Sequence, residues 1–273
     1  MPELVEVEAY RRLAEGVVGR RVAEVVAPDA WYLKRGLDAA TAEDALTGAT
    51  VTGTRRIGKL LLLDLDLDLD FDLDFDGARR VLGLRFGMSG RLVVDGQVGV
   101  GDLMYAPRLL LDKRDRFGLR FEDGGDMRMQ DPRRLGGVEL DPPEARLGPD
   151  ALSVTPSGLA AAIGHGRSTA PIKARLMDQG RIAGVGNLAA DELLWRAGLD
   201  PARPAGGLSA AELRRLHRHL RTTMSDLMER GGSHEGDLMA ERRVGGVCPK
   251  DGTPLVRRTI GGRTTFSCPK HQT

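Results

Sequence analysis

The sequence predicts an α+β protein whose first half is largely β, as a sandwich or a barrel, and whose second half is helical and ends in a β-hairpin. Short runs of apolar or alternating residues, separated by Gly and Asp, fill the first half. Beyond residue 156 the apolar residues recur at helical spacing. Near the end, two Cys-Pro-Lys tripeptides flank a Gly-Gly pair, which is typical of a hairpin between two pairs of ligands.

The first half begins with a helix expected over residues 3–15, in which Leu4 and Val7 share one side and which Gly16 ends. Gly and Asp residues then separate the segments that we expect to form strands. These segments are VAEVVA, ATVTGTRR, LLLLDLDL, VLGLRFGMSGRLVV, FGLRFEDG and DMRMQD.

A strictly alternating run, LDLDLDLDFDLDFD, extends from Leu63 to Asp76. It places Leu and Phe on one face of a strand and seven aspartates on the other. Like charges on one face repel one another. We interpret the run as an expanded, solvated hairpin, with a cation-binding site as the alternative.

The second half follows a proline-rich segment, DPPEARLGPDALSVTP, which we interpret as a linker. Helices are expected in SGLAAAIGHG, APIKARLMDQ, GNLAADELLWRAG and SAAELRRLHRHLRTTMSDLMERGG, and Ser209 with Glu212 forms a capping box in the last. The tail, CPKDGTPLVRRTIGGRTTFSCPKH, is expected to be the hairpin. The expected domains are residues 1–141, a linker over 142–156, residues 157–240 and residues 241–273.

The composition of the 273 residues fits one large domain or two medium ones. No apolar run approaches the roughly 20 residues of a membrane helix, and the start MPELVEVEAYRR does not resemble a signal peptide. We therefore expect a soluble, cytoplasmic protein. The net charge of +1 is unevenly divided, because residues 151–273 hold 18 Lys and Arg against 11 Asp and Glu. A basic face suited to phosphates is compatible with this total.

The N-terminus offers a candidate nucleophile. Pro2 follows the initiator Met, and removal of that Met leaves a secondary amine. An α-amino group titrates near pH ~8, so a fraction of it is neutral and nucleophilic at physiological pH. Such an amine can attack an aldehyde-like sugar carbon and form a cationic Schiff base, and Glu3 beside it is a candidate proton donor. Met-Pro alone is common and indicates no function.

Two ligand pairs flank the expected hairpin. Cys248 and Asp251 are separated by two residues, and so are Cys268 and His271. In a cytosolic chain a structural disulfide is not expected, and paired spacing of this kind presents four ligands to one tetrahedral ion. We interpret the four residues as one structural Zn²⁺ site. A finger-like hairpin without metal is the alternative, because a carboxylate ligand weakens such a site.

A glycine-rich turn, Gly184–Asn187, connects two expected helices, and the first of them carries Lys173. A turn of this type at a helix start exposes backbone N–H groups to an anion. We interpret the turn and the lysine as a phosphate clamp, with an ordinary helix–turn–helix corner as the alternative.

Together these motifs resemble the formamidopyrimidine-DNA glycosylase and endonuclease VIII family. MPELVEVEAYRR is similar to the family's PELPEVE start, and GKLLLLDL, FGMSGRL and DPRRLG follow in the family's order. IKARLMDQGRIAGVGNLAADELLWRAGLDP resembles its helix–two-turn–helix signature, and GGRTTFSCPKHQ resembles its zinc-finger end. The resemblance spans the chain except for the aspartate run. It implies an N-terminal β-sandwich with an N-terminal helix, a helix–two-turn–helix domain and a β-hairpin zinc finger.

The resemblance also implies a monomeric, bifunctional glycosylase and lyase of base excision repair that acts on double-stranded DNA with a damaged base or an abasic site. Pro2 would attack the sugar C1′ and Glu3 would assist ring opening. Lys59 would act in β-elimination, and Arg263 would bind a phosphate and assist δ-elimination.

Further roles follow from the resemblance, because such an enzyme flips its target nucleotide out of the duplex. Met88 and Arg133 would fill the vacated stack, and Lys173 and Asn187 would contact phosphates. The remaining expected DNA contacts are Arg114 and Arg134.

Departures from the family pattern leave the substrate open. Val5 replaces the second proline of PELPEVE, and Leu135 replaces a phenylalanine that wedges beside the opposite base. Residues 231–246 do not match the lesion-capping loop. Oxidised purines such as 8-oxoguanine or formamidopyrimidine are favoured, with oxidised pyrimidines, bulky adducts or a non-catalytic damage-binding protein as alternatives. Trp31 and Trp195 are expected to pack in the interior.

Overall fold

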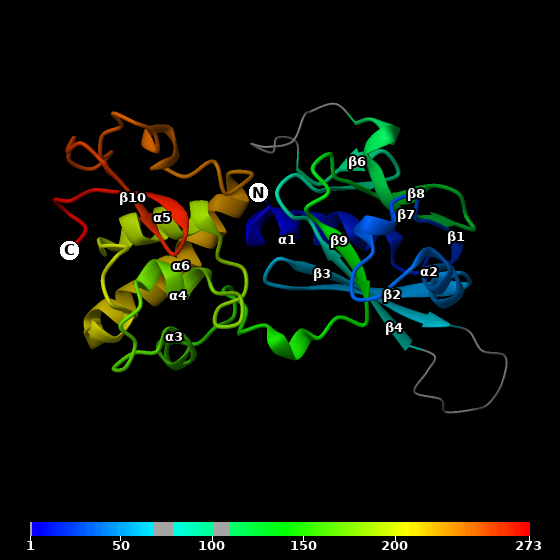
Figure 1. Cartoon of the computed structure of the whole chain (residues 1–273), viewed down its shortest axis with the longest axis horizontal. Helices are drawn as coiled ribbons and strands as arrows, with labels where there is room; N and C mark the ends of the chain where they lie inside the picture. The colour runs from blue at the N-terminus through cyan, green and yellow to red at the C-terminus, as the bar shows by residue number, and fades with distance from the viewer. Residues whose placement is uncertain (1, 68–78, 101–109) are drawn as a thin grey trace. The chain divides into compact units, whose positions relative to one another are not determined.

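The structure is a computed structural model that describes residues 2–67, 79–100 and 110–273 (Figure 1). The chain forms two compact units. The first consists mainly of Glu6–Pro143, and the second consists of Glu144–Thr273 together with Glu3–Val5. Three residues near the N-terminus therefore pack with the second half of the chain.

The first unit contains helix α1 (Leu4–Ala14) from Glu6 onwards, helix α2 (Ala39–Leu46) and two antiparallel sheets. One sheet has the strand order β1-β7-β8-β5-β6 and the other β2-β3-β4-β9. One hydrophobic core contains side chains from both sheets and from α1, which is the arrangement of a β-sandwich. The strands are β1 (Val22–Val26), β2 (Ala49–Ile57), β3 (Leu60–Leu67), β4 (Arg79–Arg85), β5 (Arg91–Val94), β6 (Gln97–Val98), β7 (Asp115–Phe121), β8 (Asp126–Gln130) and β9 (Gly137–Leu140).

The predicted segment VLGLRFGMSGRLVV is not one strand. It divides into β4 and β5, which belong to different sheets. The turn between them is closed by a hydrogen bond from the N–H of Gly90 to the carbonyl of Phe86, and Gly87 has a left-handed backbone (φ 56°). Helix α2 and the short strands β6 and β9 were not predicted, because each is too brief to show a clear periodicity.

The alternating run begins in β3 as the pattern predicts. Leu63 and Leu65 are buried, whereas Asp64 and Asp66 are half-buried and meet arginines of the neighbouring strands. Asp64 accepts from the Nε of Arg55 at 2.9 Å. The rest of the run, including its remaining aspartates, lies outside the described residues, so neither the hairpin nor the cation site is tested.

The second unit is helical and ends in a hairpin. Its helices are α3 (Pro156–Ile163), α4 (Ile172–Met177), α5 (Asn187–Ala197) and α6 (Ala210–Glu229), and the hairpin strands are β10 (Val256–Ile260) and β11 (Arg263–Ser267). The capping box at the start of α6 is present as predicted, with reciprocal hydrogen bonds between Ser209 and Glu212. Helices and hairpin confirm the predicted α+β class.

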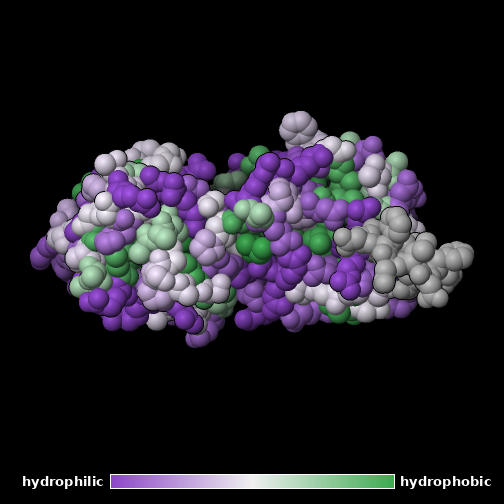
Figure 2. Space-filling view, turned by 90° about the horizontal axis from the view of Figure 1, so that it is seen from below, coloured by the Kyte–Doolittle hydropathy of each residue, from purple (hydrophilic) through white to green (hydrophobic). Residues whose placement is uncertain are grey.

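The face drawn in Figure 2 is covered mostly by hydrophilic residues, with hydrophobic residues in small groups. Within the part of the chain that the structure describes, no helix is long and apolar enough to cross a membrane.

Candidate active site

The start of helix α5 holds the carboxylate of Glu3. The N–H of Leu188 donates to Glu3 Oε1 at 2.9 Å, and the N–H of Ala189 donates to Glu3 Oε2 at 3.1 Å. Glu3 is 1% exposed. Backbone donors in the first turn and the helix dipole both stabilise a negative charge at this position. The donors that were expected to face a phosphate are therefore occupied by a carboxylate of the same chain.

The glycines of the GVGN turn make room for this arrangement. A Cβ atom at Gly186 would lie 2.1 Å from Cδ of Glu3, and one at Gly184 would lie 2.4 Å from Cδ1 of Leu4. Gly184 also has φ 114°, and its carbonyl accepts from the N–H of Leu4. The turn is thus shaped to receive Glu3 and Leu4, and this role differs from the expected phosphate clamp.

Pro2 precedes Glu3 directly and is buried. Because Glu3 and Leu4 are both hydrogen-bonded to the segment around α5, the position of the residue before them is strongly restricted. The nucleophile and proton donor expected from the sequence are therefore adjacent, and the donor is fixed.

Lys173 of α4 lies in a buried ion pair. Its Nζ is 2.7 Å from Oδ1 of Asp191 on α5, and it donates to Oγ1 of Thr265 on β11 at 2.7 Å. Neither Lys173 nor Asp191 is exposed. Burial lowers the pKa of Lys173, and Asp191 partly opposes this effect. The expected phosphate contact is not supported by this placement, because the ammonium group is buried within the protein.

Arg242 extends the same network to the hairpin. Its Nε is 2.8 Å from the second carboxylate oxygen of Asp191, and its Nη2 donates to the carbonyl of Thr264 at 2.8 Å. Thr264 directly follows Arg263 in the chain. Sequence reasoning missed both Asp191 and Arg242. The only signal was that Arg242 belongs to the segment 231–246, which departs from the family pattern.

Arg263 lies at the start of β11, after the turn formed by Gly261 and Gly262, and its side chain is exposed. Both glycines have positive φ, which a tight turn of this kind requires. Asn187 is the first residue of α5, and its side-chain Oδ1 is a buried atom without a hydrogen-bond partner among the described residues.

In the first unit, the turn that carries Met88 lies against the turn that carries Arg133 and Leu135. A Cβ atom at Gly87 would lie 2.4 Å from the backbone carbon of Leu135, so the two turns touch there. Leu135 is 54% exposed, Arg133 is exposed, and Met88 is half-buried. The structure therefore brings together the residues that the sequence assigned to the vacated base stack.

Asp131 ties these turns to each other. Its carboxylate accepts from Oγ of Ser89 at 2.6 Å, from the N–H of Arg133 at 3.1 Å and from the N–H of Gly136 at 2.8 Å. Its own N–H donates to the carbonyl of Arg114 at 3.1 Å. Asp131 is completely buried. The sequence analysis did not identify Asp131, which joins three of the segments with expected DNA contacts.

Two further cations of the first unit, Lys59 and Arg134, were expected to take part in catalysis or DNA binding, and their surroundings differ. Lys59 is half-buried in the turn between β2 and β3. Arg134 has a left-handed backbone (φ 55°), and its Nε and Nη2 both contact the carboxylate of Asp29, at 2.7 and 2.6 Å. The charge of Arg134 is therefore already paired within the protein.

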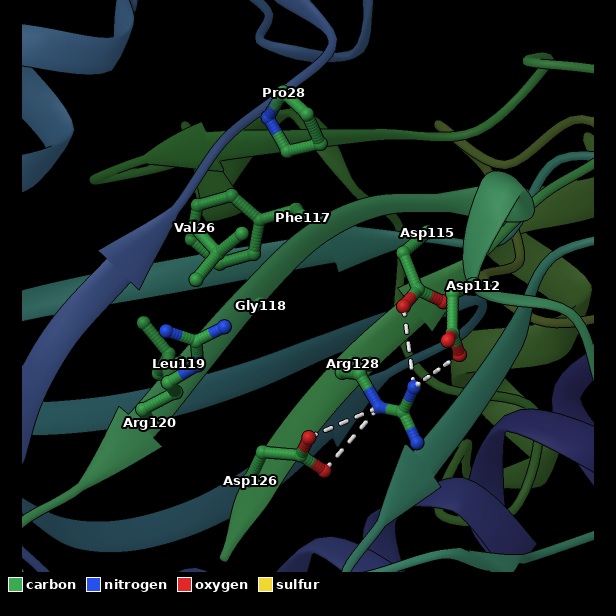
Figure 3. Close-up of a pocket in the computed structure, with 10 residues that line it drawn as sticks. All are labelled: Val26, Pro28, Asp112, Asp115, Phe117, Gly118, Leu119, Arg120, Asp126 and Arg128. Atoms are coloured by element: carbon green, nitrogen blue, oxygen red, sulfur yellow. Dashed lines mark hydrogen bonds and ion pairs between the residues drawn. The ribbon is translucent and has the colours of Figure 1, made fainter.

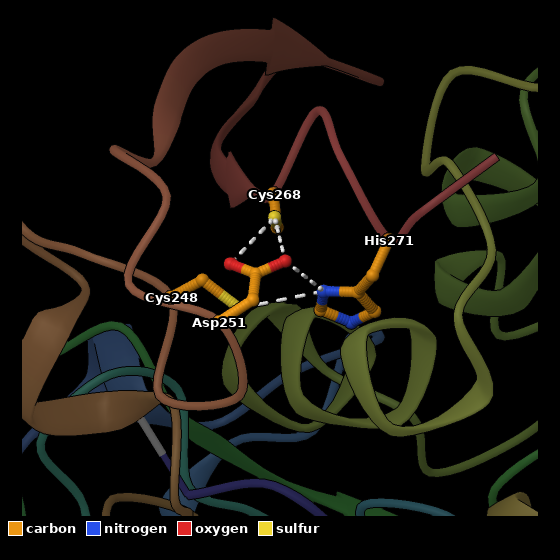
Figure 4. A group of neighbouring side chains, drawn as sticks. All are labelled: Cys248, Asp251, Cys268 and His271. Atoms are coloured by element: carbon orange, nitrogen blue, oxygen red, sulfur yellow. Dashed lines mark hydrogen bonds and ion pairs between the residues drawn. The ribbon is translucent and has the colours of Figure 1, made fainter.

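Four side chains at the end of the chain form the expected ligand cluster (Figure 4). One ligand atom from each of Cys248, Asp251, Cys268 and His271 lies within 4.8 Å of the others. The Nε2 atom of His271 is 3.0 Å from the carbonyl oxygen of Trp195, which directs Nδ1 towards the cluster. The residues present fit a tetrahedral Zn²⁺ site.

The electrostatics of the cluster differ between its oxygen and sulfur ligands. The backbone N–H of Thr253 is the main reason that the pKa of Asp251 is lowered to about 2. Burial raises the pKa of the Cys268 thiol. The carboxylate is therefore ready to bind a cation at neutral pH, whereas the thiol must lose its proton when a metal binds.

A cavity of about 260 Å³ in the first unit is a separate feature (Figure 3). Arg128 beside it is 3.1 Å from carboxylate oxygens of Asp115 and of Asp126, and 3.2 Å from one of Asp112. One guanidinium group thus pairs with three carboxylates. None of the predicted site residues lines the cavity, whose lining consists of Val26, Pro28, Asp112, Asp115, Phe117, Gly118, Leu119, Arg120, Asp126 and Arg128.

Comparisons with known proteins agree with this architecture. Residues 1–138 match the formamidopyrimidine-DNA glycosylase N-terminal domain, and residues 147–237 match the formamidopyrimidine-DNA glycosylase H2TH domain. The chain is 36% identical to the formamidopyrimidine-DNA glycosylase of Paracoccus denitrificans, over 98% of this chain and 99% of the relative. It is also 36% identical to that of Symbiobacterium thermophilum, over 100% of this chain and 89% of the relative.

A solved complex of Lactococcus lactis Fpg with abasic-site DNA has the same fold. Its TM-score is 0.78 at 23% identity, with 100% of both chains covered. Fold, site and relatives define a DNA glycosylase of base excision repair. Within that class, the chain belongs to the formamidopyrimidine-DNA glycosylase family. This confirms the family that the sequence motifs resemble.

Proposed function

We propose that the chain excises oxidised bases, with oxidised purines favoured, and then cuts the strand through a Schiff base formed by Pro2. The main support for the proposal is that Glu3, which directly follows Pro2 in the chain, accepts hydrogen bonds from the N–H groups at the start of α5. A non-catalytic binding protein has no need to bury a carboxylate beside a terminal secondary amine.

The proposed chemistry begins with attack of the neutral Pro2 nitrogen on C1′ of the sugar. The bond from C1′ to the base breaks, and the base departs with the electron pair and takes up a proton. The proton that the Pro2 nitrogen loses on bonding to C1′ passes to the carboxylate of Glu3. Glu3 then gives this proton to the ring oxygen as the bond from C1′ to that oxygen opens, which leaves an iminium ion at C1′. The fixed carboxylate of Glu3 also stabilises the positive charge of the iminium.

Strand cleavage follows from the iminium, which acts as an electron sink. Loss of a proton from C2′ expels the 3′ phosphate by β-elimination, and a second elimination expels the 5′ phosphate. We assign Lys59 to the first elimination and Arg263 to phosphate binding and the second. The exposed position of Arg263 on a rigid hairpin turn supports its assignment.

We propose that damaged double-stranded DNA is the partner and that a monomer binds it. Met88, Arg133 and Leu135 would fill the gap left by the flipped nucleotide, which the contact between their turns supports. Asn187 would contact a phosphate. Arg114 and Arg134 stay candidate contacts, although Arg134 must compete with its bond to Asp29. For Lys173 we propose a positioning role through Asp191.

The substrate range is proposed to extend beyond oxidised purines. Solved complexes of Lactococcus lactis Fpg, which share the fold, hold DNA with an oxidised pyrimidine or with N7-benzyl-Fapy-dG. In this chain the exposed Leu135 stands where the family has an aromatic wedge, so we expect a relaxed preference for the opposite base. Oxidised pyrimidines and bulky adducts are thus the second candidate substrates.

We also propose that residues 142–156 link the two domains. In addition, we propose that the cluster of Cys248, Asp251, Cys268 and His271 holds one structural Zn²⁺. Bound there, the ion would cross-link the hairpin; the local core is otherwise small, with Trp195, Leu238 and the two cysteines. Elemental analysis should find about one zinc per chain. Cys248→Ser should lose the zinc and the DNA binding, and a fully active native protein without zinc would refute the assignment.

Borohydride trapping on duplexes with an abasic site or with different damaged bases tests the proposed chemistry. A covalent adduct should form, and Pro2→Gly or an uncleaved N-terminal tag should greatly reduce it. The same tag at the C-terminus is the control. Glu3→Gln should lose base excision but keep DNA affinity. Undiminished trapping by the N-terminally tagged protein would place the nucleophile elsewhere.

A further inference from the structure

Trp31 is an exposed aromatic residue that the proposed function does not use. It lies in the short 3₁₀ helix Ala30–Tyr32 and is 67% exposed, whereas Trp195, the only other tryptophan, is 4% exposed. The expectation that both tryptophans pack in the interior is therefore wrong for Trp31. A largely exposed indole is unusual, because its large apolar area favours burial.

Hydrogen bonds hold the backbone of Trp31 although its side chain is exposed. Asp29 caps the 3₁₀ helix by accepting from the N–H of Trp31 at 3.2 Å, and the next residue, Tyr32, is completely buried. Lys34 donates through its ammonium group to the carbonyl of Trp31 and lies 4.9 Å from the centre of the indole ring. An exposed indole with an ammonium group over its ring is suited to binding a partner.

Trp31 also lies beside the turn that carries Leu135. The carboxylate of Asp29 accepts from the backbone N–H of Trp31 and from the guanidinium group of Arg134. The N–H of Lys34 donates to the carbonyl of Val138 at 2.8 Å, so the segment from Asp29 to Lys34 runs along the segment that follows Leu135. The Asp29–Arg134 ion pair therefore joins the two segments that carry the exposed side chains of Trp31 and Leu135.

The charges around Trp31 favour a polyanion. Both nearby carboxylates are paired with arginines, Asp29 with Arg134 and Glu139 with Arg35 and Arg85. The ammonium of Lys34 binds only a neutral carbonyl and the indole face among the described contacts, so its charge is not neutralised. An aromatic face next to a lysine matches a nucleotide, which offers a flat base and a phosphate.

We propose that Trp31 and Lys34 form a further DNA contact that binds a nucleotide of the duplex beside the one met by Leu135. The inference rests on the proposed function, because the Leu135 turn must face the DNA. A second copy of this chain is the other conceivable occupant. A single indole and its lysine offer much less area than the roughly 800 Å² per partner of a stable protein interface, so the nucleotide is favoured.

The chain has two tryptophans, so fluorescence can report on Trp31 alone. The Trp195→Phe variant, whose only indole is Trp31, should be titrated with a duplex that holds a stable abasic-site analogue. DNA should quench its emission and protect the indole from acrylamide. The Trp31→Phe variant should show neither change. Continued access of acrylamide to Trp31 in the complex would overturn the inference.

Affinity measured with dye-labelled duplex separates this inference from the proposed function. Trp31→Ala should weaken binding about tenfold, within the range for loss of one aromatic–base contact. Lys34→Met should also weaken binding, and Val244→Ala, at an exposed valine of the second unit, should not.

If the wild type binds and cleaves the duplex while Trp31→Ala has unchanged affinity, only the inference fails. If the wild type does not bind damaged duplex at all, both fail. If Trp31 is protected without DNA and the chain sediments as a dimer, the indole belongs to an interface between copies, which contradicts the proposed contact.

Discussion

At the scale of single residues, the small size of Gly186 lets the carboxylate of Glu3, which we propose to act in catalysis, reach the start of α5. The backbone of Gly186 (φ −111°, ψ −168°) is accessible to any residue, so a side chain there causes no backbone strain. The obstacle is the contact itself, because an added methyl group would overlap the carboxyl of Glu3. Gly186 therefore matters because it has no side chain, and not because its backbone is more flexible than that of other residues.

Gly186→Ala should displace Glu3 from the N–H groups of Leu188 and Ala189. Base excision in single-turnover assays should fall by about 100-fold, the lower end of the effect of losing an acid catalyst. Affinity for the damaged duplex should change only a few-fold. Gly207→Ala is the matched control, since no atom lies within 4 Å of the added Cβ. Equal excision by both variants would show that Glu3 does not need this seat.

At the scale of elements, helix α6 is stabilised at its start by a charge that titrates. Burial alone would raise the pKa of Glu212, but the N–H of Ser209 and the guanidinium of Arg203 outweigh burial and lower the pKa to about 2. The ordinary value is 4.5, so the folded state favours the ionised form. This stabilisation is complete above pH 4.5 and is lost as the pH falls towards 2.

Glu212→Gln should lower the free energy of unfolding at pH 7 by about 1–2 kcal/mol, as expected when the hydrogen bonds of a charged carboxylate at the helix cap are weakened. The variant should also lose the part of the pH dependence that lies between about pH 4.5 and 2. Denaturant unfolding followed at several pH values measures both effects. Glu229→Gln, at the exposed end of the same helix, should leave the curve unchanged; an equal effect there would exclude the cap as the cause.

The hairpin that carries Arg263 is contacted by the segment 231–246, whose role was not predicted from the sequence. Arg242 binds both Asp191 of α5 and the backbone beside Arg263, so the segment 231–246 braces the hairpin turn. The N–H groups of Asp237 and Leu238 also donate to Glu192, the next residue of α5. Consecutive acidic residues of α5 thus hold this segment in place.

Arg242→Met should leave Asp191 with Lys173 as its only cation and loosen the turn. The expected cost to stability is about 2 kcal/mol, because hydrogen bonds to a buried charge are lost. Strand cleavage should fall more than base release when the two are timed separately in single-turnover assays. Arg243→Met removes a neighbouring exposed arginine and should affect neither step. A parallel loss of both steps in Arg242→Met would mean general damage to the fold.

At the scale of the whole molecule, local patterns were predictable and distant contacts were not. The capping box of Ser209 and Glu212 and the hairpin between the ligand pairs were predicted, because their partners are close in sequence or share a period. Glu3 meets α5 across more than 180 residues, and Lys173 meets Asp191 only because two helices pack. Lys173 and Arg134, which were expected to contact phosphates, are paired with Asp191 and Asp29. The spacing of residues in the sequence does not reveal these partners.

The distribution of charge predicts how binding responds to salt. The chain carries a net charge of only +1, yet the proposed phosphate contacts are local cations, chiefly Arg263 and Lys59. Each cation that binds phosphate releases condensed counterions, so the slope of log affinity against log salt should be about −0.9 per contact on duplex DNA. Binding should therefore weaken steeply with salt despite the near-neutral total.

Arg263→Ala should make this slope shallower by about one unit and should also impair strand cleavage. Arg257→Ala is the matched control, because it removes the same charge from an exposed position on the neighbouring strand β10. If only total charge mattered, both variants would change the slope equally. Because the proposed contact is specific, Arg257→Ala should leave the slope nearly unchanged, and equal slopes for the two variants would remove Arg263 from the DNA interface.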